Sequence, residues 1–130
     1  MRRITLTIFS VLMLLLLFFL MRSTYTQSNF DKLLTQNYEL LLPADVKATV
    51  PQITKKEWSR TAEWSIDTDQ SWQEYRTWLG KQIGGTYRVL SEADGQVFLR
   101  KTYHSEIHDI QLTADEVEGK IHVVFRLSLW

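Results

Sequence analysis

Two histidines and a glutamate alternate near the end of the chain, at His104, Glu106 and His108. Side chains two residues apart on a straight strand point the same way, so these three groups could converge on a divalent metal ion. Such a site would support a metal-dependent hydrolase. The three residues also fall where two neighbouring strands are expected to turn, and a turn would separate their side chains. We therefore expect a solvated polar turn without a metal, and the hydrolase is the enzymatic alternative.

A second candidate for cation binding is the pair Asp67 and Asp69. Two carboxylates can hold a divalent ion. They also directly precede a predicted helix, where free backbone amides and the helix dipole favour acidic side chains. The sequence favours this capping role for the pair.

Other catalytic chemistry is poorly represented. The chain has no cysteine, which excludes disulfides, thiolate metal sites and a cysteine nucleophile. The phosphate-binding loop, the G-x-S-x-G nucleophile pattern and H-E-x-x-H are not found in the sequence. Fifteen basic residues balance fifteen acidic ones, whereas a nucleic-acid partner calls for basic excess. We expect no cofactor, no nucleic acid and no catalytic activity.

The N-terminal segment Ile4 to Met21 contains no charged residue. A helix of this length spans about 27 Å, close to the hydrocarbon thickness of a bilayer. Arg2 and Arg3 precede it, and positive charge on the short flank predicts a cytoplasmic N-terminus. A cleaved signal peptide is the rival interpretation, but its apolar region usually has only roughly 7–15 residues and ends at a small-residue site. The sequence predicts a short cytoplasmic tail at 1–3 and an uncleaved anchor at 4–21. The anchor would lie in the plasma membrane (the inner membrane of a bacterium), with the rest periplasmic or extracellular.

Residues 22–56 are predicted to form a stalk helix and a linker. Ser28 and Asn29 can cap a helix, and apolar residues then recur at helical spacing until Pro43 ends it. The apolar stripe could pack on its own domain, lie on the membrane or pair with a partner helix. Ala44 to Lys56 is expected to be extended, with room for an edge strand.

The remaining residues, 57–130, are predicted to form one small α+β domain. Glu57 to Asp67 alternates as a half-buried strand does, and Ser71 to Glu74 matches a capping box before a helix that ends at Gly84. Four further strands and turns follow, giving the order β-α-β-β-β-β. We expect a mostly antiparallel sheet with one helix packed on one face. Four tryptophans fall on predicted core faces, namely Trp58, Trp64, Trp72 and Trp78. A glycan- or small-ligand-binding module, the third functional class, would require exposed rings instead.

One helix cannot cover both faces of such a sheet. Phe98, Val124 and Trp130 fall on the opposite face, so we predict that they form a partner-binding surface. In outline, a cytoplasmic tail, one span, a stalk and a small α+β domain resemble the single-pass assembly subunits of pilus and type II secretion platforms. The resemblance implies a protein-interaction or envelope-assembly role with a protein partner in the cell envelope.

Overall fold

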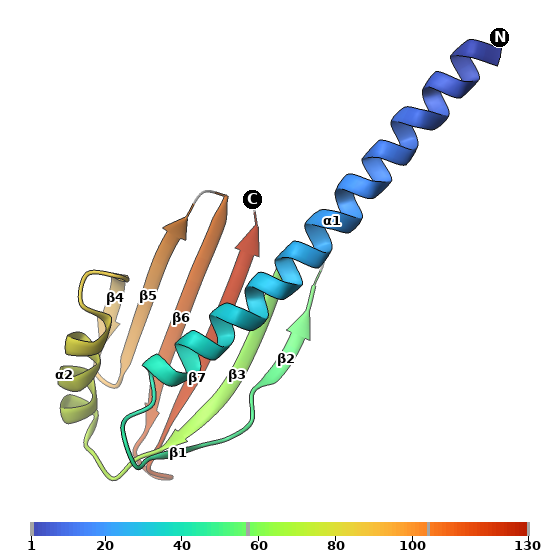
Figure 1. The fold of residues 1–130 in the computed structure, drawn as a ribbon. Coiled ribbons are helices and arrows are strands. Elements are labelled where there is room, and N and C mark those ends of the chain that lie inside the picture. Colours follow the sequence, from blue (N-terminus) through green and yellow to red (C-terminus); the bar gives the residue numbers. More distant parts are fainter. Residues whose placement is uncertain (1, 57, 104, 130) are drawn as a thin grey trace. The chain divides into compact units, whose positions relative to one another are not determined.

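The computed structural model describes residues 2–56, 58–103 and 105–129, with residues 23–28 and 129 described by their backbone alone. These residues form two helices and seven strands (Figure 1). The elements are α1 (Arg2–Leu40), β1 (Lys47–Ala48), β2 (Gln52–Lys55), β3 (Ser59–Asp67), α2 (Trp72–Ile83), β4 (Arg88–Ala93), β5 (Gln96–Tyr103), β6 (Glu106–Asp115) and β7 (Lys120–Leu129). The chain divides into two compact units, residues 1–33 and residues 34–130, which we describe separately.

The first unit is the N-terminal part of α1. Its segment Arg2–Arg22 is long and apolar enough, by length and composition, to cross a membrane. The predicted new helix start at Ser28 and Asn29 is wrong, because α1 continues unbroken to Leu40. Residues 2–42 contain neither glycine nor proline, and a side chain that is able to cap does not by itself end a helix.

The second unit is built on one antiparallel sheet with the strand order β1-β3-β7-β6-β5-β4, in which β2 also pairs with β3. The predicted α+β class and the strands on either side of α2 are confirmed. β1 and β2 arise from the segment expected to be mostly linker, and both pair with the outer edge of β3. At the other edge, β4 contains a register shift between Val89 and Ser91, a bulge that leaves Leu90 without a direct partner on β5.

One face of the sheet carries the core. Its buried strand residues alternate along β3, β5, β6 and β7, as period-two patterning requires; they are Ala62, Trp64, Ile66, Val97, Leu99, Ile110, Leu112, Ile121, Val123, Phe125 and Leu127.

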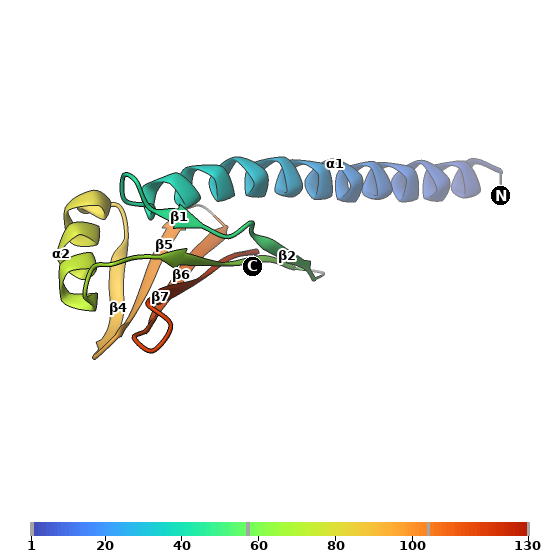
Figure 2. The ribbon, with the colours of Figure 1, turned by 90° about the horizontal axis from the view of Figure 1, so that it is seen from below.

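Two helical segments of this unit cover that face, where the sequence predicted one (Figure 2). The last turns of α1 join α2, and the Tyr75 hydroxyl donates a 2.6 Å hydrogen bond to the Leu41 carbonyl. The ring of Tyr38 lies 5.6 Å from that of Trp64, and the Tyr87 hydroxyl donates to Asn37 at 2.8 Å. The stalk stripe therefore packs on its own domain at this end.

Ser71 and Gly84 cap the two ends of α2 at the predicted positions. The Glu74 amide donates to the Ser71 side chain at 3.3 Å, and Gly84 closes the helix with a φ of 50°. Trp72, like Trp64, is buried as predicted. Trp58 is not buried: its side chain is 54% exposed, and it precedes the first residue of β3, outside the alternating strand.

Candidate functional site

The structure places Glu106 and His108 within β6, so the expected solvated turn is wrong for these two residues. They do share a face, as their spacing predicted, but that face is the covered one. Glu106 is 8% and His108 is 3% exposed, and His108 Nε2 lies 3.0 Å from a carboxylate oxygen of Glu106. His104, the third member of the proposed set, lies outside the described residues. The two described members form a buried hydrogen-bonding contact at the end of the core.

The opposite face of the sheet is free of helices in the described part of the second unit. The strand register places Val124 beside Gln111, and Gln111 beside Phe98, so the three residues form one row across β7, β6 and β5. Both apolar members are half-buried, while Gln111 is exposed. We call this set the apolar row. It contains two of the three predicted partner-binding residues, and Trp130, the third, lies outside the described residues.

A second row runs parallel to the first and is basic. The register aligns Arg126, Asp109, Arg100 and Arg88 on successive strands, so the row contains three guanidinium groups and one carboxylate. Arg100 makes two hydrogen bonds to Asp109, at 2.7 and 3.1 Å, and its guanidinium lies 5.7 Å from the centre of the Phe98 ring. The hydrogen bond from Arg100 to Asp109 raises the pKa of the guanidinium, which stays charged. We call these four residues the basic row.

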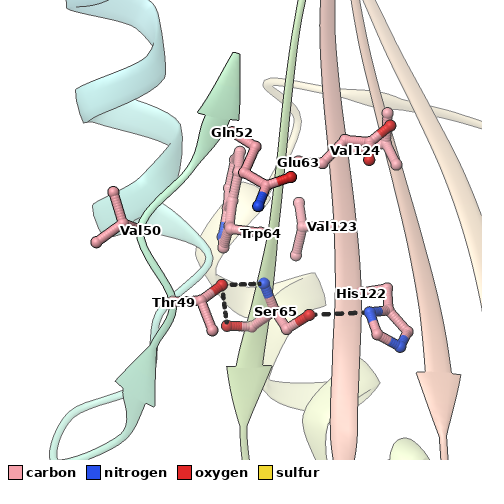
Figure 3. A pocket seen from close by; sticks show the side chains of 9 residues that line it. All are labelled: Thr49, Val50, Gln52, Glu63, Trp64, Ser65, His122, Val123 and Val124. Carbon is pink, nitrogen blue, oxygen red and sulfur yellow. Dashed lines mark hydrogen bonds between the residues drawn. The ribbon is translucent and has the colours of Figure 1, made fainter. Parts of the chain in front are cut away.

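Figure 3 shows a pocket of about 450 Å³ beside the apolar row. It forms where the chain between β1 and β2 leaves the edge of β3. Thr49 still pairs with Ser65, whose amide donates to the Thr49 hydroxyl oxygen at 2.9 Å, whereas Val50 is 84% exposed. The open-face part of the lining is mixed in character, with Glu63, Ser65, His122 and Val124.

His122 was not singled out by the sequence, yet it lines this pocket. Its Nδ1 is 2.9 Å from the Ser65 hydroxyl on the neighbouring strand, and its Nε2 is 3.8 Å from a carboxylate oxygen of Asp115. One side-chain ligand atom from each of Asp115, Glu118 and His122 lies within 4.8 Å of the others. In the sequence, Asp115 and Glu118 lie in a polar stretch from Asp115 to Gly119, and His122 lies in the alternating apolar stretch that follows. Only the return of β7 alongside β6 brings them together.

Asp67 and Asp69 are both exposed, and the helix start that they precede is capped by Ser71. Ser71, and neither aspartate, therefore makes the side-chain capping bond of α2. That the two carboxylates favour this helix end through its dipole stays a prediction. Thr68 stabilises the loop between β3 and α2, because its hydroxyl oxygen accepts a hydrogen bond from the Gln70 amide at 3.1 Å.

No family model, no curated protein and no solved structure matches this chain. Its function must therefore be inferred from the site itself.

Proposed function

We propose that this chain is a membrane-anchored protein without catalytic activity, whose folded domain lies outside the cytoplasm and binds a protein partner of the cell envelope. The observation that carries the proposal is the uncovered sheet face, on which the apolar row adjoins the basic row. The apolar segment Arg2–Arg22 supports the anchor. Its flanking Arg2 and Arg3 support a cytoplasmic N-terminus.

The chemistry of the face indicates the kind of partner. Val124 and Phe98 offer apolar surface to either side of Gln111, whose amide can donate and accept hydrogen bonds. The adjoining basic row carries three positive groups and one negative group. An extended protein segment with apolar side chains and a nearby acidic group complements both rows, because opposite charge guides association and apolar contact stabilises the complex.

In-membrane crosslinking at Gln111 tests this proposal. A photoreactive amino acid at Gln111 should crosslink to a partner in intact membranes. The same substitution at Gln73, an exposed glutamine of α2, is the matched control and should not crosslink. Val124→Glu should strongly reduce crosslinking at position 111, since it places a carboxylate among the apolar contacts.

The charge of the partner is tested separately. Arg126→Gln should weaken capture and reduce its dependence on salt, because exposed charges attract less at high ionic strength. Equal crosslinking at positions 73 and 111, or undiminished crosslinking in a folded Val124→Glu protein, would refute the proposed surface.

A further inference from the structure

We propose that Asp115, Glu118 and His122 form a zinc-binding site at the turn between β6 and β7. These residues supply two carboxylates and one imidazole, a nitrogen and oxygen donor set that zinc accepts. The site is distinct from the buried pair Glu106 and His108, which lies at the opposite end of β6. It does not depend on the proposed docking surface.

The spacing of two of the donors fits ligands around one ion. His122 Nε2 and the Asp115 oxygen are 3.8 Å apart, which is too long for a hydrogen bond. Two ligand atoms at about 2.1 Å from a tetrahedral zinc lie roughly 3.4 Å apart, and never more than about 4.2 Å. The observed separation falls between these values. The side chain of Glu118 is exposed, and one of its carboxylate oxygens lies within 4.8 Å of the other two donor atoms.

Contacts outside the donor atoms orient two of the three ligands. In the tautomer that the site requires, His122 donates from Nδ1 to the Ser65 hydroxyl, which leaves the lone pair of Nε2 directed at the carboxylates. One oxygen of Asp115 accepts a 3.2 Å hydrogen bond from the Glu118 amide, and the other faces the imidazole. Ser65 on β3 is thus a positioning residue for the imidazole of His122 on β7.

Three protein ligands leave a fourth position of a tetrahedral zinc for water. His122 also lines the pocket shown in Figure 3, where its Nδ1 meets the Ser65 hydroxyl. A zinc ion here would join β6, the turn and β7, and through Ser65 it would also fix the neighbouring part of β3.

Zinc titration of the full chain in detergent micelles tests the site. After removal of metals with a chelator, the wild-type protein should bind one zinc ion, as measured by calorimetry and elemental analysis. His122→Ala and Glu118→Gln should each abolish or strongly weaken binding. Ser65→Ala should weaken it by about 10- to 100-fold, the effect typical of losing an outer hydrogen-bond partner of a metal ligand.

Two matched controls separate this site from general binding by surface groups. Glu116→Gln changes an exposed carboxylate in the same turn, and His104→Ala removes a histidine that precedes β6 rather than following it. Both should retain wild-type affinity. The inference is overturned if folded wild-type protein fails to bind zinc, or if Glu118→Gln and His122→Ala bind it as tightly as the controls do. Should His122→Ala fail to fold, the exposed Glu118→Gln variant decides the result.

Discussion

At the scale of single residues, the two faces of β3 differ most sharply at Trp64 and Glu63. Trp64 is 4% exposed and packs beside Tyr38, whereas Glu63 points to the open face and is exposed. Trp64→Ala should destabilise the protein by about 3–5 kcal/mol, because it leaves a large cavity. Glu63→Ala should change stability by less than about 0.5 kcal/mol. Chemical denaturation of both variants compares the two free energies of unfolding, and similar losses would contradict the register of β3.

The opposite orientations of Trp64 and Glu63 could be predicted from the sequence, because successive side chains on a strand point to opposite faces of the sheet. The environment of His122 could not be. Its contact with Ser65 joins residues that are 57 positions apart, and nothing in the local pattern specifies this pairing. Glu106 and His108 illustrate the same limit: their shared direction was evident, but whether that direction was solvent or core depended on where β6 begins.

At the scale of elements, Tyr75 joins α2 to the chain that follows α1. Burial raises the pKa of its hydroxyl, which also donates to the Leu41 carbonyl. Above about pH 10 an unfolded chain would lose this proton while the folded protein retains it, so the folded state should become less stable as pH rises. At neutral pH, Tyr75→Phe should lower the free energy of unfolding by about 1 kcal/mol, because the hydrogen bond is lost. Between about pH 9 and 11, however, this variant should lose less additional stability than the wild-type protein does.

Thermal melting across this pH range measures the difference. Tyr103→Phe is the control, since Tyr103 is 58% exposed, and it should follow the wild-type pH dependence. Burial also raises the pKa of Tyr87. This residue therefore contributes to the loss of stability at high pH in the wild type and in both variants. If Tyr75→Phe loses as much stability as the wild type when the pH rises, the Tyr75 hydroxyl does not couple folding to proton loss.

Element type was more predictable than element boundaries. The caps of α2 could be located because Ser71 and Gly84 each act within one turn of the helix. The end of the stalk at Pro43 was also signalled locally. The start of the stalk could not be located in this way, because Ser28 and Asn29 resemble a cap but do not act as one. Since no glycine or proline interrupts the chain there, α1 simply continues through them.

At the scale of the whole molecule, the proposed topology is testable because the chain has no cysteine. A single cysteine at Thr77, an exposed site on α2, should react with a membrane-impermeant maleimide in intact cells. A cysteine at Arg3 should react only after the membrane is permeabilised. This result follows from the positive flank preceding the apolar segment. Labelling of both sites in intact cells, or of neither, would contradict an anchor with a cytoplasmic N-terminus.

The bulge in β4 has a consequence for solubility. An edge strand offers unpaired backbone groups to any other extended chain, and regular edges promote aggregation. Here the extra residue, Leu90, interrupts the regular spacing, and charged Arg88 and Glu92 lie on either side of it. The irregular edge of β4 therefore discourages sheet-to-sheet polymerisation between copies of the protein. The proposed anchor would increase the importance of this protection, because it would concentrate those copies in two dimensions.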